Sequence, residues 1–466
     1  MNFNISNISI IGLYKIYNYN IPIAGDKLIL VGENGSMKTT IISMIYYLLS
    51  CQWSKLYEYN FKAIELTAND EKLIVAHDDI DKFYKLAEIN AKYERFMPKS
   101  LVKKITSAVI DMGFVNKIDK FEFFRTIERD YKIPKHFIAD YSEEISKYIN
   151  KTNLRLPAVA EKIKKELKAQ VIYLPTYRRI EQELRAILPH LMPVDEANDR
   201  RMLGVKIEQD IDVRSNDYIE LVKFGMEDVV GLINKTMDNM KEFIRNELST
   251  LTGTYLQDVI SGKYKNVKPE ALHNINVEAL ESILDRIDER ILPTEEKERL
   301  KHRIIEISKL TKLSAEKKIS AHFILKLYEL LKQQHKREKN IYEFVSICNK
   351  YISDKKLKYN NNNFTIKIFL STLSSGEIEF KSLSSGEKQI VSLFCHILLS
   401  ENKKFFILID EPELSLSVKW QSMLLPDIMN TNKCSGIIAV THSPFMFDND
   451  FRNNVASLDL LMEQHG

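Results

Sequence analysis

The sequence predicts an α/β fold: a head built from both ends of the chain, with helical and coiled-coil insertions between them. Three apolar runs support this prediction, at 28–31, 405–409 and 436–440. The first leads into a glycine-containing loop and an apolar-faced helix, and the other two end in polar residues. Short apolar runs bounded by turn residues are typical of buried strands, and longer stretches with a 3.6-residue period are typical of helices.

The composition is that of an ordinary globular protein. The chain has 466 residues, 44% of them hydrophobic and 28% charged, with a formal net charge of +3. This length accommodates two or three domains. The small net charge gives no overall attraction to nucleic acid, so any basic surface must be local. We find no signal peptide and no apolar run of membrane-spanning length, so we expect a cytoplasmic protein that does not enter a membrane. The four cysteines are widely spaced, which favours core thiols in a reducing compartment.

The N-terminal region predicts strands, followed by a phosphate-binding loop. Residues 3–31 alternate in the manner of strands, and a hairpin is predicted at 61–77 with its turn at 67–70. Tyr14, Tyr17 and Tyr19 are either rings for an adenine face or exposed strand aromatics. The loop itself resembles the pattern G-x-x-x-x-G-K-[ST], whose backbone N–H groups hold phosphate oxygens at a helix N-terminus. Its candidate nucleotide-binding residues are Gly32, Asn34, Gly35, Ser36, Met37, Lys38, Thr39 and Thr40.

Within this loop, Lys38 is expected to reach the β and γ phosphates, and the Thr39 hydroxyl to hold Mg²⁺. Met37 departs from the pattern, because it occupies the place of the second glycine and a side chain restricts the backbone there. The cofactors that this loop implies are ATP and Mg²⁺.

Two largely helical regions separate the predicted parts of the head. The predicted division is 1–77 (head with P-loop), 78–168 (helical insertion), 169–225 (head), 226–353 (helical or coiled-coil insertion) and 354–466 (head). A loop is predicted at Asn153–Pro157, and breaks in the second helical region at Gly253, Gly262 and Pro293. A strand at 170–174 leads to Arg178 and Arg179, which face either a phosphate or solvent, and residues 190–216 are polar enough for a loop.

The segment 301–339 contains eleven lysines and arginines opposed by four glutamates. Such a segment is either a solvated helix face or a surface for an acidic partner, which is a nucleic acid or an acidic trigger protein.

The C-terminal region contains two LSSGE strings. The first, 373–377, precedes an alternating pattern and predicts a hairpin turn. The second, 383–387, precedes a helical period, and so places small residues at a helix N-terminus that receives an anion. Its candidate binding residues are Ser384, Ser385, Gly386 and Glu387.

The apolar runs near the C-terminus end in candidate catalytic residues. Asp410, at the end of one strand, suits Mg²⁺ coordination beside Thr39, and Glu411 suits a base on the attacking water. His442 follows the other strand and is placed to reach the γ phosphate. The alternative for all three is an ordinary surface role.

The strings GENGSMKTT, LSSGEKQ, LIDEPELSLS and VTHSP together resemble the ABC-type ATPases of the SMC, Rad50, RecF and OLD kind. The resemblance covers 1–80, about 170–230 and 360–450. It implies an ATP-sandwiched head dimer, in which Lys38, Thr39, Asp410, Glu411 and His442 serve one nucleotide while Ser384 and Gly386 serve the partner's. No glutamine stands where this class has its Q-loop, so that role is unassigned.

Within the class, the phrase YLPTYRRIE resembles the ATPase subunit of PARIS antiphage systems, with Septu and retron ATPases as the runner-up. This resemblance implies a sensor ATPase, acting as a homodimer or a higher oligomer such as a trimer of dimers. Such an ATPase controls a separate effector nuclease, of Toprim type in PARIS and of HNH type in Septu. The alternative function is a Rad50- or RecF-like ATPase that acts directly on DNA. The sequence identifies neither the trigger nor the stoichiometry.

Overall fold

The computed structural model describes most of the chain and divides it into two compact units. Unit 1 comprises residues 1–222 and 403–466, and unit 2 comprises residues 223–402. The described residues are 5–33, 35–69, 71–112, 133–152, 155–175, 218–220, 226–273, 284, 293–308, 313–371, 376–400 and 403–464.

Unit 1 contains a six-stranded parallel sheet in the order β13-β3-β12-β11-β6-β7. Its central strands are continuous apolar runs, as expected for strands that are covered on both faces. The strand from Phe405 to Asp410, for example, is buried at every position. The strands are β3 (Lys27–Val31), β6 (Gln170–Leu174), β7 (Tyr218–Glu220), β11 (Phe405–Asp410), β12 (Cys434–Val440) and β13 (Val455–Ser457).

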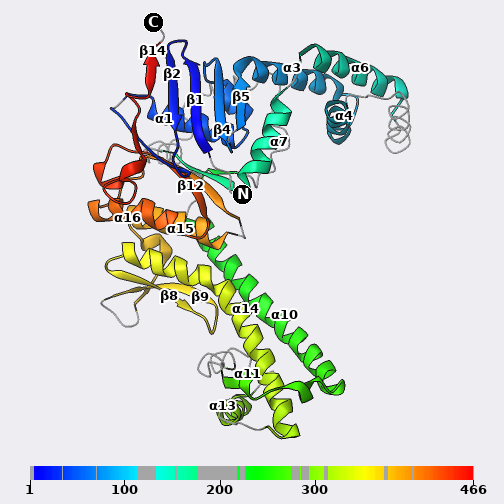
Figure 1. Cartoon of the computed structure of the whole chain (residues 1–466), viewed down its shortest axis with the longest axis vertical. Helices are drawn as coiled ribbons and strands as arrows, with labels where there is room; N and C mark the ends of the chain where they lie inside the picture. The colour runs from blue at the N-terminus through cyan, green and yellow to red at the C-terminus, as the bar shows by residue number, and fades with distance from the viewer. Residues whose placement is uncertain are drawn as a thin grey trace. The chain divides into compact units, whose positions relative to one another are not determined.

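A second, antiparallel sheet of unit 1 has the order β14-β2-β1-β4-β5. Its strands alternate buried and exposed positions, which is the pattern of a sheet with one face on the core. In Figure 1 it lies beside α1 (Lys38–Leu49). Its strands are β1 (Ile5–Leu13), β2 (Tyr17–Pro22), β4 (Ala63–Ala68), β5 (Glu71–Ala76) and β14 (Met462–Gln464).

Helix α1 belongs to the core that both sheets of unit 1 share. Its side chains at Ile41, Ile42 and Ile45 are fully buried, in one cluster with residues of both sheets. Burying a side chain of this size contributes roughly 1.5–3 kcal/mol, so the helix that begins at the P-loop is firmly anchored. The other helices of this unit are α2 (Trp53–Tyr57), α3 (His77–Tyr93), α4 (Lys99–Met112), α6 (Lys135–Thr152), α7 (Leu156–Leu167) and α16 (Val418–Met429).

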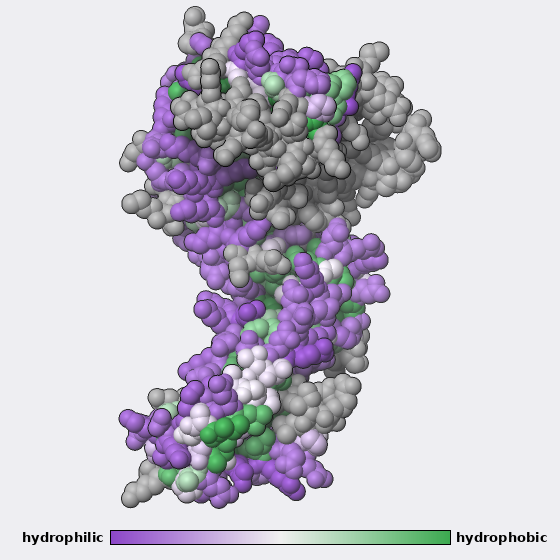
Figure 2. Space-filling view, turned by 90° about the vertical axis from the view of Figure 1, so that its right-hand side faces the viewer, coloured by the Kyte–Doolittle hydropathy of each residue, from purple (hydrophilic) through white to green (hydrophobic). Residues whose placement is uncertain are grey.

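Unit 2 combines two long helices with a small antiparallel sheet. Helices α10 (Met226–Ile260) and α14 (Ala315–Tyr351) run side by side, and the sheet has the order β10-β9-β8 (Figure 1). Figure 2 shows a mostly hydrophilic face of this unit with an apolar area toward one end, and the large exposed apolar side chains of α10 are Leu256 and Ile260. The remaining elements are α11 (Glu270–His273), α13 (Thr294–Ser308), α15 (Ser385–Leu399), β8 (Lys355–Asn360), β9 (Thr365–Leu370) and β10 (Glu377–Ile378), with the 3-10 turns η2 (Lys263–Asn266) and η3 (Phe380–Ser382).

Three local expectations are corrected by the structure. Helix α10 passes through Gly253 without a break, because packing along the helix outweighs the cost of about 1 kcal/mol for one glycine. Helix α7 begins at Leu156 inside the expected loop, since Pro157 is well tolerated in a first helical turn. The first hairpin turns more tightly than expected, because β4 extends to Ala68 and β5 begins at Glu71.

The structure also groups residues 354–402, expected as part of the C-terminal head segment, with unit 2. The five-part division of the chain stays a prediction. None of the helices in the described part of the chain is long and apolar enough to cross a membrane.

Candidate nucleotide site

The phosphate-binding loop joins β3 to α1 in unit 1. Its backbone is tight at Gly32, where an added Cβ atom would lie 2.7 Å from Ser36 Oγ. Gly35 has φ +87°, a conformation that side chains rarely adopt. Helix α1 begins at Lys38, so its unpaired N–H groups face the loop. This is the strand-loop-helix context that the motif requires.

Met37 occupies the N-cap of α1 with φ 63° and ψ 16°. This left-handed conformation is the one that glycine adopts freely, and for another residue it costs about 1 kcal/mol. The Met37 side chain is half-buried against the core, with its sulfur 4.0 Å from the hydroxyl of Tyr19. The missing glycine therefore does not change the path of the backbone, which Met37 follows under strain.

The Lys38 ammonium group is buried and binds its own loop. Its Nζ atom donates to the carbonyl oxygens of Gly32 at 3.0 Å and Glu33 at 2.7 Å, and to Ser36 Oγ at 3.2 Å. Burial lowers the pKa of Lys38, and nearby carboxylates oppose this change, the strongest being Glu411 and then Asp459. The lysine therefore lies in a pocket of negative charge that suits a cation.

The parallel register brings the three motif strands together at one edge. Strand β12 lies between β3 and β11, with Val440 beside Leu30 on one side and beside Asp410 on the other. The backbone continues this pairing, because Glu411 N donates to the Val440 oxygen at 2.8 Å. Since the strands are parallel, the P-loop, the acidic pair and the His442 loop all leave the sheet in the same direction.

Asp410 is the residue best suited to a metal. Its side chain is 4% exposed, and neither carboxylate oxygen has a hydrogen-bond partner within the described residues. An unpaired buried carboxylate is costly unless a cation compensates it. Thr39, which follows Lys38, is the candidate for a second Mg²⁺ ligand, and this role stays a prediction. No cluster of three or more metal-ligating side chains occurs among the described residues.

Glu411 lies beside Asp410 with φ 48°, another left-handed backbone. Burial, then the negative charges of Asp410 and Glu413, raise its pKa, while His442 and Lys38 oppose the rise. A raised pKa favours proton uptake from water, which is what a general base must do.

His442 follows β12 and is exposed to solvent. Its backbone N–H donates to Glu413 Oε1 at 2.7 Å. Our sequence reasoning missed Glu413, although the acidic string Asp-Glu-Pro-Glu was a visible signal. It also missed Asp459, for which no signal existed, because its place beside Lys38 depends on the pairing of β13 with β3.

The second LSSGE string begins helix α15 in unit 2. Ser384 is the N-cap, and it forms a capping box with Glu387, whose Oε2 accepts from Ser384 N at 2.7 Å. Glu387 also pairs with Lys355 at 2.8 Å, so its carboxylate is already engaged within this unit. Ser384 and Ser385 are exposed and Gly386 is buried. The binding role of these four residues stays a prediction.

The other candidate residues from the sequence are either placed away from a binding role or lie outside the described residues. Tyr19 is buried and Tyr14 is exposed, so Tyr19 cannot offer a free ring face to adenine. Asn34, Arg178 and Arg179 lie outside the described residues, as do the loop at 190–216 and most of the first LSSGE string.

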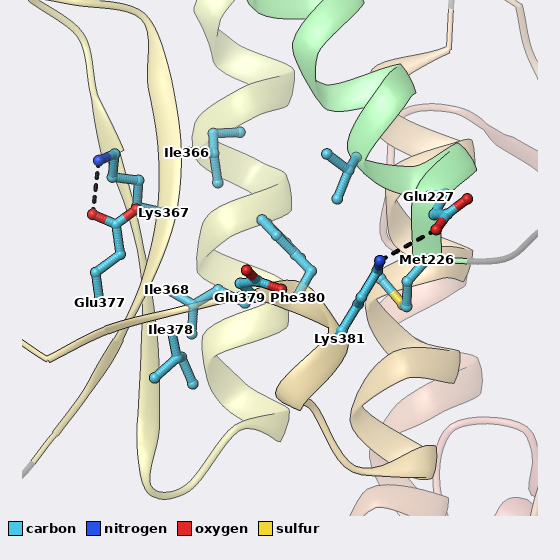
Figure 3. Close-up of a pocket in the computed structure, with 11 residues that line it drawn as sticks. Met226, Glu227, Ile366, Lys367, Ile368, Glu377, Ile378, Glu379, Phe380 and Lys381 are labelled. Carbon is cyan, nitrogen blue, oxygen red and sulfur yellow. Dashed lines mark hydrogen bonds and ion pairs between the residues drawn. The ribbon is translucent and has the colours of Figure 1, made fainter.

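A separate cavity of about 620 Å³ lies in unit 2, between the start of α10 and strands β9 and β10 (Figure 3). Its apolar lining includes Ile366, Ile368 and Phe380. Ion pairs lie at its rim, Lys367 with Glu377 at 2.7 Å and Lys381 with Glu227 at 3.2 Å. Nothing in its lining repeats the nucleotide-binding motifs of unit 1.

Comparisons of the chain with known proteins found a family profile and similar solved structures. A protein-family profile described as "AAA domain, putative AbiEii toxin, Type IV TA system" matches residues 226–448, a little under half of the chain. A solved structure of the Smc head domain with an extended coiled coil, bound to the C-terminal domain of ScpA from Pyrococcus furiosus, is 14% identical, with a TM-score of 0.34 over 99% of this chain and 96% of that chain. No curated protein matches the chain.

The fold is that of an ABC-type P-loop ATPase head, with a parallel sheet whose strands carry the nucleotide-binding motifs. The chain is an ATPase.

Proposed function

We propose that the edge of the parallel sheet in unit 1 binds and hydrolyses ATP with the residues that the motifs predict. The observation that carries this proposal is the convergence there of Lys38, Asp410, Glu411 and the His442 loop. Lys38 exchanges its loop carbonyl partners for the β and γ phosphate oxygens, and the N–H groups of the P-loop hold the same phosphates.

Glu411 accepts a proton from the attacking water, and His442 contacts the γ phosphate. Asp410 and Thr39 hold Mg²⁺, which neutralises the charge that develops on the phosphates when it is bound. The negative surroundings of Lys38 are then balanced by the metal, because Asp410 has no protein partner among the described residues.

The complete site includes a second copy of the chain. The exposed Ser384 and Ser385, at the N-terminus of the fifteen-residue helix α15, offer N–H groups and hydroxyls to the nucleotide of the partner. Gly386 is buried in the first turn of this helix. The capping box and the ion pair with Lys355 hold this turn in place.

The biological role that we propose is that of a cytoplasmic sensor ATPase in a bacterial antiphage defence system. In this role the ATPase, as a dimer or higher oligomer, restrains a separate effector nuclease until infection is sensed. Two observations support it: the YLPTYRRIE string with its resemblance to PARIS ATPases, and a family description that names a toxin. The effector is of Toprim type in the PARIS reading and of HNH type in the Septu reading.

The second candidate function is a DNA-maintenance ATPase that binds DNA directly, favoured by the excess of basic residues at 301–339. Part of that excess is neutralised inside unit 2, because Lys301 pairs with Glu298 and Lys326 with Asp258, two carboxylates outside 301–339. We therefore rank it below the defence role. Tight DNA binding that weakens steeply with salt would reverse this ranking.

The proposal of a separate effector is tested by incubating the purified chain with plasmid, linear DNA and tRNA, in the presence of Mg²⁺ or Mn²⁺. We expect ATP hydrolysis and intact nucleic acids, with cleavage or toxicity only in the presence of a separate effector nuclease. The Glu411→Gln variant is the control for hydrolysis. Cleavage by the pure chain that disappears with a carboxylate substitution in this chain would refute a separate effector.

A further inference from the structure

The turn after β11 and the loop after β12 are joined by more than their parent strands. Glu413, in the turn, accepts the His442 backbone N–H at 2.7 Å through Oε1. Beside this bond, Ser443 Oγ lies 2.6 Å from Gln421 Oε1, and Gln421 Nε2 donates to the Leu416 oxygen at 3.0 Å. Two side chains thus connect the segment that carries Glu411 to the segment that carries His442.

The shape of the turn directs Glu413 toward the loop. Glu411 and Ser415 both have positive φ, 48° and 65°, so the chain reverses sharply on either side of Glu413. Leu414 N bonds to the Glu411 oxygen, and Leu416 N bonds to the Glu413 oxygen, which fixes the turn internally. The carboxylate is therefore presented from a rigid support.

The His442 side chain lacks a comparable support. It is exposed, and no hydrogen bond to either ring nitrogen is found in the described part of the chain. Its backbone amide is held by Glu413, so the orientation of the imidazole depends on that bond, on the Ser443–Gln421 contact and on the peptide that follows β12. A hydrogen bond to a carboxylate is shorter and roughly twice as strong as one between neutral groups.

The second oxygen of Glu413 makes this contact costly to maintain. Glu413 Oε2 is buried and has no hydrogen-bond partner among the described residues. A buried charged oxygen without a partner costs stability, whereas an apolar side chain at this position would avoid that cost. The chain therefore keeps a costly group at the junction of its two catalytic segments, which is typical of a functional position.

We infer that Glu413 is a positioning residue for ATP hydrolysis, which clamps the His442 loop onto the turn that carries Glu411. This inference rests on the proposed roles of Glu411 and His442. In the clamped state the imidazole and the base face the same phosphate, and loss of the clamp leaves nucleotide binding intact while misaligning His442.

The test measures kcat and ATP affinity in Glu413→Ala, Glu413→Gln and the matched control Asp450→Ala, an exposed carboxylate in the segment after His442. We expect Glu413→Ala to lower kcat about tenfold with ATP affinity within twofold, because an interaction that positions a group acts on the transition state. The glutamine variant keeps an acceptor oxygen for His442 N–H, so it should retain most of the activity. Equal losses in the glutamine and alanine variants would contradict the clamp.

A double-mutant cycle with His442→Ala shows whether Glu413 acts through His442. If it does, Glu413→Ala should cause no further loss of kcat in the His442→Ala background. Independent, multiplicative losses would overturn the inference. A fully active His442→Ala variant would instead reject the proposed role of His442.

Hydrogen–deuterium exchange of the ATP-free protein tests the clamp apart from activity. In Glu413→Ala the peptide that covers residues 441–446 should exchange faster, while Asp450→Ala should match the native protein. Unchanged exchange at 441–446 would overturn the inference even if kcat falls. Unchanged exchange rejects the clamp, whereas a fully active His442→Ala variant rejects the proposed role of His442, so the two failures are distinguishable.

Discussion

The Lys38 ammonium group lies 2.7 Å from the carbonyl oxygen of Glu33, so the lysine of the P-loop binds the loop that surrounds it. With Gly32 and Ser36 as the other two acceptors, its three protons are all engaged. ATP must therefore replace existing hydrogen bonds of a buried cation. The replacement is favourable because phosphate oxygens carry charge and carbonyl oxygens do not.

Lys38→Ala should abolish tight ATP binding, because it removes the cation that faces the β and γ phosphates. We expect a loss of affinity of at least about a hundredfold, since a buried charge pair is worth roughly 3 kcal/mol or more. Isothermal titration with a non-hydrolysable ATP analogue measures it. Equal affinity in the variant and the native protein would end the P-loop assignment.

Glu411→Gln should leave ATP binding close to native and slow hydrolysis about a hundredfold or more, because the phosphate and Mg²⁺ ligands survive while the base is lost. The measurements are ATP affinity and single-turnover hydrolysis. The raised pKa of Glu411 also predicts how the native activity depends on pH. Protonation removes the base, so on acidification the activity should begin to fall at a higher pH than it would with an ordinary glutamate. Rapid hydrolysis by the variant would assign the base elsewhere.

The strained backbone at Met37 predicts an unusual order of substitutions. Met37→Gly should keep ATP binding, because glycine adopts φ 63° without strain. Met37→Ile should lower the melting temperature and weaken ATP binding, since a β-branched residue is strongly disfavoured at positive φ, by about 1–2 kcal/mol. Thermal unfolding with and without ATP compares the two. Better tolerance of isoleucine than of glycine would show that the apolar contact with Tyr19, and not the backbone, decides this position.

Replacing Gly386 with tryptophan should impair hydrolysis without weakening ATP binding, because the buried first turn of α15 has no room for a large side chain. In the proposed dimer this turn serves the partner's nucleotide. A mixture of Gly386→Trp and Lys38→Ala chains should then regain up to one functional site per dimer. The in-trans arrangement is contradicted if mixed dimers form and none of them hydrolyses ATP.

His396, buried in the same helix, predicts a pH dependence of stability. Burial lowers the pKa of its imidazole to about 4, from an ordinary value of 6.5. The unfolded chain takes up a proton below pH 6.5 and the folded chain only near pH 4, so the free energy of unfolding should fall across that window, by up to about 3 kcal/mol. His396→Leu should reduce this fall in urea unfolding at pH 7 and pH 4.5. An identical pH dependence in the variant would assign the effect to other groups.

The sequence predicted the positions of several strands and helix starts correctly. Strand β6, the start of α10 and the start of α15 lie where the periodicity placed them. These signals are local: an apolar run has a strand period or a helix period regardless of its partners. The glycine at position 253 misled the prediction because the packing that holds α10 together is not a local property.

Residues that work through tertiary pairing were beyond the reach of the sequence. Asp459 acts on Lys38 only because β13 pairs with β3, and the contact of Glu413 with His442 needs two turns to meet. At Met37 the sequence departs from the P-loop motif, and this departure suggested that the backbone of the loop would be restricted. The backbone nevertheless adopts the conformation that the motif needs, because tertiary packing of the side chain overrides local preference.

Strand β3, which precedes the P-loop, has its sheet partners β12 and β13 about 400 residues further along the chain, a very high sequence separation for neighbouring strands. At a translation rate of about 5–20 residues per second, the ribosome delivers these partners roughly 20–80 s after β3 itself. Throughout that interval β3 lacks both of its native neighbours in the parallel sheet. We therefore expect the proposed ATP site to be complete only after synthesis has passed Val440, because Asp410 and the His442 loop are delivered last.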